Sequence, residues 1–222
     1  MPECERPDHV VTDALLVGRP EPLGVRSCGM GRFVYWMNTS LDLFIEGSAA
    51  EGGGGEWLRI GEELHREFNA RAASLSLMVE GRVIYEVMEP FWPRVAQDPS
   101  QPNYLREYGA IWTQMPKVLV SNSRTEAGHN TRVVGGPDAI AQLATIRAET
   151  DGAIGVGGAT LATALLTADL LDELMLFTHP VILGHGRPLF DAHEGALELD
   201  LLEQASYDGG VTLHRYALRR RT

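Results

Sequence analysis

The chain has 222 residues, of which 44% are hydrophobic and 22% are charged, and this composition excludes a disordered, collagen-like or disulfide-framework protein. There are 30 acidic residues against 19 basic ones, for a formal net charge of -11, which argues against bulk electrostatic binding of nucleic acid or an anionic membrane. An anionic ligand would have to be bound locally, by a few hydrogen-bond donors placed around it. No apolar run of about 18 residues is present, and the N-terminus lacks the order of a signal peptide. We therefore expect a cytoplasmic protein without a membrane partner.

Two segments divide the sequence. Residues 1–30 carry four prolines and scattered charges, and we expect an N-terminal extension outside the core. Residues 31–222 are expected to form a single domain, interrupted by a surface loop at residues 52–55. The cysteines, Cys4 and Cys28, form no zinc-like spacing, which fits a reducing compartment.

Strands and helices are expected to alternate through most of the chain. A stripe of Trp57, Ile60, Leu64 and Phe68 at steps of three and four predicts an amphipathic helix. Strands are expected at 32–37, 75–79, 117–121, 131–134 and 153–156, helices at 56–73, 82–88, 137–147 and 159–168, and mainly loop at 99–115. Strands then follow at 173–181, 196–207 and 210–218, the last two joined by a hairpin at 208–210. This order predicts an α/β fold with a mostly parallel central sheet, an antiparallel C-terminal hairpin and flanking helices.

The strongest local motif is glycine-rich and lies where a strand turns into a helix. Gly155, Gly157 and Gly158 would let a phosphate approach the backbone and the helix N-terminus. Their alternative role is a tight turn with close helix–strand packing. Leu161 stands where a dinucleotide fingerprint has its third glycine, and no P-loop lysine follows, which disfavours a Rossmann domain or an NTPase.

Two further turns follow predicted strands. Gly81-Arg82 offers an arginine at a helix start, and Ser121-Asn122-Ser123-Arg124 combines hydroxyl groups with a guanidinium. Each is weak alone, and the alternative is a solvated turn. Ligands of open α/β sheets bind at the carboxyl ends of strands, where all three turns fall.

The order of these segments resembles a known family. The motifs are Ser40-Leu41-Asp42, Gly81-Arg82-x-x-Tyr85-Glu86, Ser121-x-Ser123-Arg124, Gly155-x-Gly157-Gly158-Ala159-Thr160-Leu161, Asp172-Glu173-Leu174 and His179-Pro180-Val181-Ile182-Leu183-Gly184-x-Gly186-x-Pro188-Leu189-Phe190. From about Arg32 to Leu218 the chain resembles the reductases typified by the C-terminal domain of the bifunctional riboflavin-biosynthesis deaminase/reductase, which share the dihydrofolate reductase fold. The deaminase half, with its zinc ligands, has no counterpart here, so the resemblance is to a stand-alone reductase.

The resemblance implies NADPH as cofactor. By position, the cofactor-binding residues are Gly81, Arg82, Ser121, Ser123, Arg124, Gly155, Gly157, Gly158, Ala159, Thr160 and Leu161. Ser123 and Arg124 resemble the turn that grips the adenosine 2′-phosphate. An arginine there favours NADPH over NADH, because a guanidinium can meet the phosphate in a bidentate manner.

The resemblance also places the substrate. Ser40 and Asp42 match the loop beside nicotinamide and substrate, and Asp42 is the candidate for polarising or protonating the acceptor. An ungapped count puts His65 where dihydrofolate reductases carry an acid, which makes it a candidate substrate-binding residue. Two residues depart from the family: Leu43 replaces a glycine and Ile84 replaces a threonine.

The expected function is hydride transfer from NADPH to a C=N or C=C acceptor in a small heteroaromatic or imine substrate, related to 5-amino-6-(5-phosphoribosylamino)uracil reductase. Alternatives are that reductase step itself, a dihydrofolate reductase-like activity, and a non-catalytic NADP-binding protein. The family also implies a homodimer. His179, His185 and His193 lie close in sequence, but no carboxylate or cysteine completes a familiar ligand set, so no metal is expected.

Overall fold

The computed structural model describes residues 30–47, 55–193 and 195–219. Most of the predicted extension, residues 1–29, lies outside the described residues, as do residues 52–54 of the predicted loop. Met30, the last residue of that extension, forms an antiparallel bridge with Asp151.

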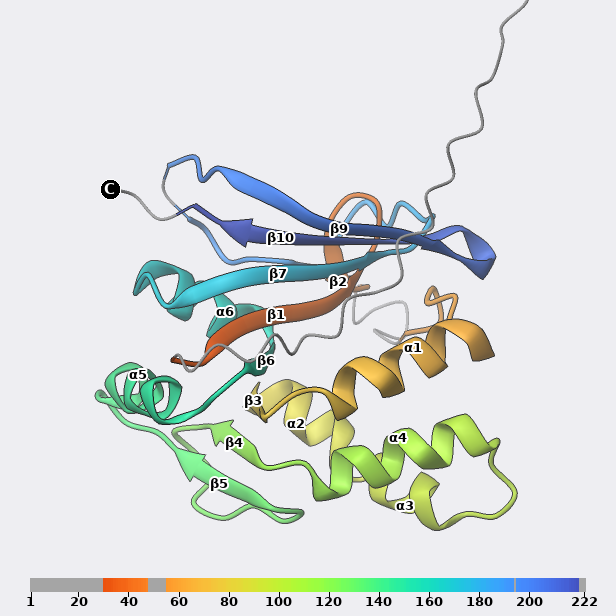
Figure 1. Cartoon of the computed structure of the whole chain (residues 1–222), viewed down its shortest axis with the longest axis horizontal. Coiled ribbons are helices and arrows are strands. Elements are labelled where there is room, and N and C mark those ends of the chain that lie inside the picture. Colours follow the sequence, from red (N-terminus) through yellow and green to blue (C-terminus); the bar gives the residue numbers. More distant parts are fainter. Residues whose placement is uncertain (1–29, 48–54, 194, 220–222) are drawn as a thin grey trace, which may run out of the picture.

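An eight-stranded sheet forms the centre of the molecule (Figure 1). Its strands, in spatial order, are β5 (Thr131–Val134), β4 (Lys117–Val120), β3 (Leu77–Gly81), β6 (Ala153–Gly157), β1 (Arg32–Thr39), β7 (Leu171–Thr178), β10 (Val211–Leu218) and β9 (Leu199–Tyr207). The pairs from β5 to β7 are parallel, and β10 runs antiparallel to both of its neighbours. The mostly parallel sheet and its antiparallel C-terminal hairpin are therefore confirmed.

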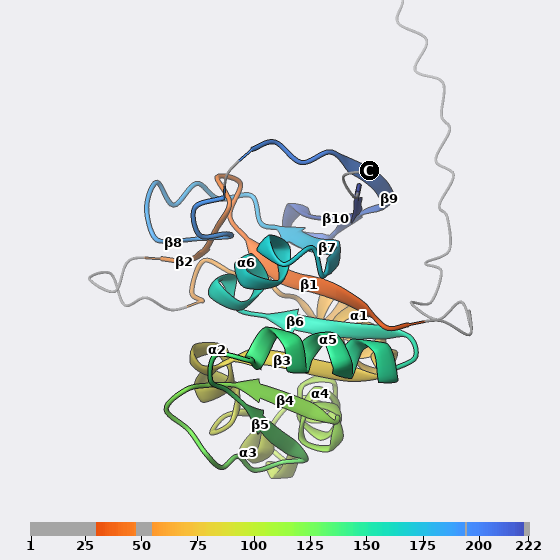
Figure 2. The ribbon, with the colours of Figure 1, turned by 90° about the vertical axis from the view of Figure 1, so that its left-hand side faces the viewer.

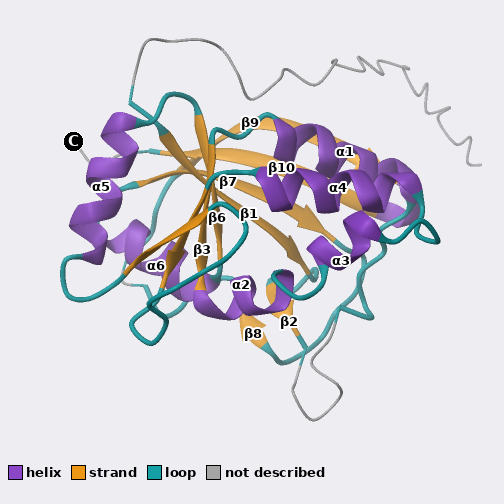
Figure 3. Ribbon diagram, turned by 90° about the horizontal axis from the view of Figure 1, so that it is seen from below, coloured by secondary structure: helices purple, strands orange, loops and turns teal. Residues whose placement is uncertain are grey.

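Helices cover both faces of this sheet (Figures 2 and 3). They are α1 (Glu62–Ala73), α2 (Arg82–Met88), α3 (Trp92–Gln97), α4 (Asn103–Gln114), α5 (Ala139–Glu149) and α6 (Ala159–Thr167). Alternation along β1 sends side chains to opposite faces: Phe33 and Tyr35 pack in the core with α5 and α6, while Val34 packs in the core with α1 and α4. Within the described residues, none of these helices is long and apolar enough to cross a membrane.

The helix predicted at residues 56–73 begins later than its apolar stripe suggests. Trp57 and Ile60 continue the stripe, but the helix starts at Glu62 after Gly61, whose backbone is extended. Trp57 instead packs edge-on against His179, with ring centroids 5.4 Å apart. His179 is fully buried, and its Nδ1 accepts a hydrogen bond from the Arg59 amide at 2.9 Å. The segment before α1 is thus held across the end of β7, so its apolar residues pack without forming a helix.

The prediction of mainly loop at residues 99–115 was wrong, because α4 occupies residues 103–114, and α3 precedes it. Gly109 reads as a helix breaker, yet a Cβ there would lie 2.6 Å from the carbonyl oxygen of Trp92. The glycine therefore allows α3 and α4 to pack closely. The short pair β2 (Phe44–Glu46) and β8 (Arg187–Pro188) was also missed, since strands of two or three residues carry no alternation.

Lys117, the only lysine of the chain, lies inside the fold and is 2% exposed. Its ammonium donates hydrogen bonds to the carbonyl oxygens of Trp112 (2.5 Å) and Met115 (2.7 Å) and lies over the Trp112 ring. These are carbonyls at the end of α4, where a cation is favoured by the helix dipole. Burial lowers the pKa of Lys117 to about 8.

Candidate functional site

The four predicted site segments follow four neighbouring strands. They come after β4, β3, β6 and β1, which are adjacent and parallel in the sheet. Because the carboxyl ends of parallel strands meet at one edge, the turns at residues 40–43, 81–82, 121–124 and 157–160 share that edge. Figure 3 shows α2, β2 and β8 at the same end of the sheet. The structure therefore brings together the segments that were selected separately from the sequence.

The glycine turns after β3 and β6 lie against each other. A Cβ at Gly81 would lie 3.6 Å from the Gly157 carbonyl oxygen, and one at Gly158 would lie 3.8 Å from the Gly81 Cα. Gly158 has a φ of +103°, which L side chains rarely adopt, and it precedes the first residue of α6. The result is two side-chain-free backbone turns beside a helix N-terminus, where backbone amides and the helix dipole favour an anion.

Ile84 lies over these turns. Its Cγ2 would be 3.4 Å from a Cβ at Gly157 and 3.8 Å from one at Gly158. The family's threonine is thus replaced by an apolar side chain that packs on the glycines and offers them no hydroxyl group.

The turn after β4 is ordered by a serine. Ser121 is buried, and its hydroxyl oxygen accepts hydrogen bonds from the amides of Ser123 (3.2 Å) and Arg124 (3.0 Å). Ser121 therefore shapes the turn, while Ser123 is exposed and Arg124 is partly exposed.

Both predicted phosphate-binding arginines form ion pairs with glutamates, one in α2 and one directly after it. Arg82 pairs with Glu86 at 2.6 Å, and Arg124 pairs with Glu89 at 2.7 Å. Arg124 also lies over the Tyr85 ring, 5.4 Å from its centroid. The hydrogen bond from Arg124 is the main cause that holds the pKa of Glu89 below its ordinary value.

A third arginine at this edge was missed by sequence reasoning. Arg187 of β8 donates a hydrogen bond to the Thr160 hydroxyl at 2.8 Å, in the first turn of α6, and pairs with Asp191 at 2.7 Å. It stands at the second unassigned position of the Gly184-x-Gly186-x-Pro188 motif, and this place in the motif was the signal that could have identified it. The N-terminus of α6 thus has a guanidinium beside it.

The loop after β1 is tied together by Asp42. Its carboxylate accepts hydrogen bonds from the Ser40 hydroxyl (2.6 Å) and from the amides of Leu183 (3.1 Å) and Gly184 (2.7 Å). These bonds, that of Ser40 first, lower the pKa of Asp42 to about 2, so the group is ionised at neutral pH. It can position or polarise a neighbour, whereas proton donation would require a proton that it does not carry.

Ser40 and Leu43 complete this loop. Ser40 is fully buried, and its hydroxyl also accepts a hydrogen bond from the Phe44 amide at 2.9 Å. Leu43, which stands where the family has a glycine, has a φ of +62°, a left-handed conformation that glycine adopts without strain and leucine does not.

His65 lies on α1 rather than at the strand ends. It is buried, its ring contacts Trp92, Tyr104 and Tyr108, and its Nδ1 lies 3.2 Å from Asn69 Oδ1. Burial lowers its pKa. Its partners thus belong to α1, α3 and α4, and its contact with substrate stays a prediction.

A buried acid that the sequence did not single out lies close to the glycine turns. Glu80 is 5% exposed and pairs in register with Gly157, where a Cβ would lie 3.7 Å from Glu80 Cγ. One carboxylate oxygen accepts a hydrogen bond from Trp112, and the other is buried without a partner. Burial raises its pKa to about 7. Within the described part of the chain, no cluster of three histidine, cysteine or acidic side chains is placed to hold a metal.

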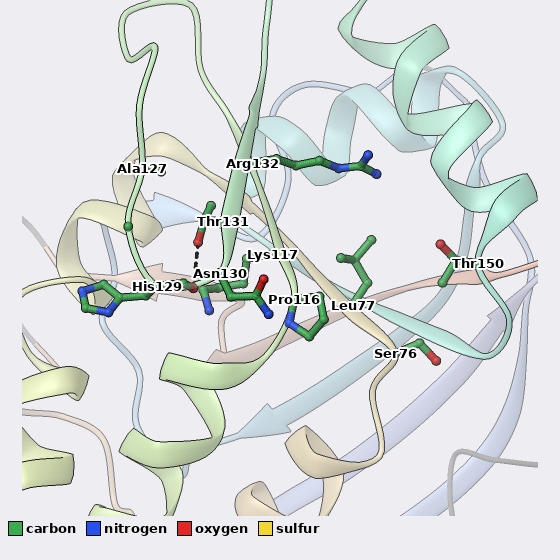
Figure 4. Close-up of a pocket in the computed structure, with 11 residues that line it drawn as sticks. Ser76, Leu77, Pro116, Lys117, Ala127, His129, Asn130, Thr131, Arg132 and Thr150 are labelled. Atoms are coloured by element: carbon green, nitrogen blue, oxygen red, sulfur yellow. Dashed lines mark hydrogen bonds between the residues drawn. The ribbon is translucent and has the colours of Figure 1, made fainter.

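An open hollow of about 630 Å³ lies at the opposite end of the strands, where their amino ends are (Figure 4). It is lined by the starts of β3, β4 and β5, including Leu77, Lys117 and Thr131. Because ligands of parallel sheets bind at carboxyl ends, this hollow is separate from the predicted site.

These strands, faces and turns define an α/β domain with the dihydrofolate reductase fold. A solved dihydrofolate reductase from Enterococcus faecalis is similar in fold, with a TM-score of 0.55 and 14% identity, covering 86% of this chain and 98% of that one. The sequence model of the family described as "RibD C-terminal domain" matches residues 34–213, and the chain belongs to that family.

Two further solved structures share this fold, and one protein is similar in sequence over a short stretch. Acinetobacter baumannii RibD has a TM-score of 0.61 and 17% identity over 87% of this chain and 59% of its own. A pyrimidine reductase-like protein from Corynebacterium diphtheriae has a TM-score of 0.56 and 16% identity over 86% and 92%. The uncharacterized protein YyaP of Bacillus subtilis (strain 168) is 38% identical over 55 residues, which are 25% of this chain and 29% of YyaP.

Proposed function

We propose that the protein is an NADPH-dependent reductase that transfers a hydride to a C=N or C=C bond of a small heteroaromatic or imine substrate. The observation that carries the proposal is the meeting, at one sheet edge, of the glycine turns, the N-terminus of α6 and the arginines 82, 124 and 187. Membership of the RibD C-terminal domain family supports a reductase of the kind that acts on 5-amino-6-(5-phosphoribosylamino)uracil.

The donor set fits a polyanionic dinucleotide. In a chain of net charge -11, three arginines gather at this edge beside the N-terminus of α6. Each is paired with a carboxylate, so an anionic ligand would compete with Glu86, Glu89 or Asp191 for these donors. Gly81, Gly157 and Gly158 carry no side chain, and a diphosphate would have to lie over their backbone beside Ile84. Arg124 would face the 2′-phosphate, with Ser123 beside it.

NADPH supplies the hydride when it is bound, and the protein contributes orientation and electrostatics. Asp42, ionised and tied to residues 183 and 184, would fix the loop that borders the substrate and would favour a cationic or hydrogen-bond-donating acceptor such as an iminium. Ser40 would keep that loop in shape through its bonds to Asp42 and Phe44.

The test has two stages. NADPH binding is first measured by calorimetry on the wild-type chain and on the Arg82→Ala/Arg124→Ala double variant, and the double variant is expected to lose most of the affinity. NADPH oxidation is then followed at 340 nm with a panel of imines, pterins and aminopyrimidines. Unchanged affinity in the double variant would refute the cofactor placement.

A non-catalytic NADP-binding protein is the second candidate. It is favoured by one observation: three donors already engage the carboxylate of Asp42, the only acid that we assign to catalysis. Tight NADPH binding without turnover of any panel member would support this role over the reductase.

We also propose a homodimer. Strand β9 lies at the edge of the sheet, and Leu199, Leu201 and Leu202 on it are 39%, 52% and 50% exposed. An apolar edge strand is a ready surface for a second copy.

A further inference from the structure

The guanidinium of Arg124 is held in a two-pronged ion pair. Its two terminal nitrogens lie 2.7 and 3.4 Å from the two carboxylate oxygens of Glu89, which follows the last residue of α2. Both side chains are about one quarter exposed, at 28% and 25%. Glu89 therefore occupies the two terminal guanidinium nitrogens with which Arg124 would bind a phosphate in a bidentate manner.

Glu89 is itself fixed in place. The Tyr85 hydroxyl can donate a hydrogen bond to Glu89 Oε1 at 3.2 Å, and the nearby backbone of Gly128 also favours the ionised form of Glu89, which lowers its pKa. Tyr85 is buried, and its one hydroxyl hydrogen goes either to Glu89 or to the Gly128 carbonyl oxygen, which lies at 3.1 Å. The carboxylate thus has anchors besides Arg124, and it would stay nearby if the arginine turned to another anion.

We propose that Glu89 is a specificity-determining residue, which opposes a phosphate at Arg124 and so narrows the preference of the protein for NADPH over NADH. This inference rests on the proposed function, because it takes Arg124 to face the adenosine ribose. A 2′-phosphate at Arg124 would lie beside a carboxylate of like charge and would compete with it for the same donors. A ribose 2′-hydroxyl carries no charge and can donate to a carboxylate.

The neighbouring pair provides a comparison within the same helix. Glu86 pairs with Arg82 at 2.6 Å, but these side chains are more exposed, at 40% and 47%, and solvent screens their charges more strongly. Arg82 directly follows Gly81, whose turn lies against Gly157, so we take it to face the diphosphate that NADH and NADPH share. Any effect of Glu86 should therefore be equal for the two cofactors, whereas Glu89 should oppose the binding of NADPH alone.

The experiment measures the Kd of NADPH and of NADH by calorimetry on the full chain, for wild type, Glu89→Gln and the matched control Glu86→Gln. We expect Glu89→Gln to tighten NADPH binding by about tenfold and to leave NADH unchanged or weaker. Glu86→Gln is expected to shift both cofactors by the same factor. Thermal unfolding of each variant checks the fold, and Glu89→Ala repeats the test without an amide that could hydrogen-bond to Arg124.

Three results would overturn the inference. If Glu89→Gln and Glu89→Ala weaken NADPH binding, Glu89 serves to position Arg124 for the phosphate. If the Kd values of both cofactors change by the same factor, Glu89 does not discriminate between them, and only the inference fails. If wild type binds neither cofactor, the proposed function fails and the inference falls with it.

Discussion

The indole nitrogen of Trp112 in α4 donates a hydrogen bond of 3.1 Å to one carboxylate oxygen of Glu80, a buried acid of β3. The other carboxylate oxygen has no partner among the described residues. The nearby charged or titratable groups are Lys117 of β4, whose charge lowers the pKa of Glu80, and Tyr108 of α4. Burial is the larger effect, and it raises the pKa of Glu80 from 4.5 to about 7.

Glu80→Gln should therefore stabilise the protein at alkaline pH. A carboxyl group with a raised pKa in the folded state stabilises folding while it is protonated and loses that contribution as pH rises from about 4.5 to about 7. The gain in free energy of unfolding should be small near pH 4.5 and on the order of 2 kcal/mol at pH 8, measured by denaturant titration. Glu173→Gln is the control: that buried glutamate pairs with Arg215 at 2.7 Å, and its loss should destabilise by roughly 3 kcal/mol at pH 8. A stability gap for Glu80→Gln that shrinks with rising pH would contradict the prediction.

Leu43 provides a test of backbone strain. Its φ of +62° costs a leucine about 1 kcal/mol, and glycine would remove this cost but lose a similar amount through the entropy of the unfolded chain. Leu43→Gly is expected to leave the melting temperature nearly unchanged. Leu43→Val, with a branched Cβ, should lower the free energy of unfolding by more than about 1 kcal/mol. Equal stability of the valine and glycine variants would show that this loop relaxes freely.

Gly158→Ala should separate folding from cofactor binding. Gly158 has a φ of +103°, and Gly209, in the hairpin between β9 and β10, has a φ of +76°. Alanine at either position should cost about 1–2 kcal/mol of stability. Calorimetry should show loss of NADPH affinity for Gly158→Ala alone, because only its backbone faces the proposed diphosphate. Equal NADPH affinity in the two variants would place the diphosphate elsewhere.

Arg187→Gln tests the arginine that sequence reasoning missed. Removing the guanidinium beside Thr160 should weaken NADPH and NADH alike by about tenfold, since the diphosphate is common to both. Arg219→Gln is the matched control, because Arg219 pairs with Asp200 and Glu198 on the β9–β10 side of the sheet. Affinities that respond equally to both substitutions would reflect net charge rather than a site.

The proposed homodimer can be tested at β9. Leu201→Glu places a charge on the exposed edge strand and is expected to convert a dimer to a monomer in analytical ultracentrifugation. Val87→Glu, at a similarly exposed position on α2, should leave the sedimentation unchanged. A wild-type chain that sediments as a monomer over the micromolar range would end the proposal.

The sequence predicted several elements from their composition. The helix at residues 82–88 has the predicted bounds, because an extended glycine precedes it. The strand at residues 32–37 was predicted from its run of β-branched and aromatic residues, which fits the burial of β1 on both faces of the sheet. Residues 103–114 were missed, since Gly109 looks like a breaker until α3 is placed against it.

Contacts within the site between residues far apart in the sequence could not be predicted. Three turns could be found because each directly follows a predicted strand, and the fourth, at residues 40–43, came from the resemblance to the family. The Arg124–Glu89 pair joins residues 35 apart, and the Arg187–Thr160 bond joins residues 27 apart. No local pattern encodes such contacts, so the partners that tune the arginines had to come from the fold.

The burial of Lys117 gives the protein an intrinsic chemical reporter. Apart from the terminal amine, its ammonium is the only amine in 222 residues, and it is capped by two carbonyl groups at the end of α4. An acylating reagent should modify this side chain only when β4 and the end of α4 separate. The rate of lysine labelling, read by mass spectrometry, would therefore measure that opening without any engineered probe.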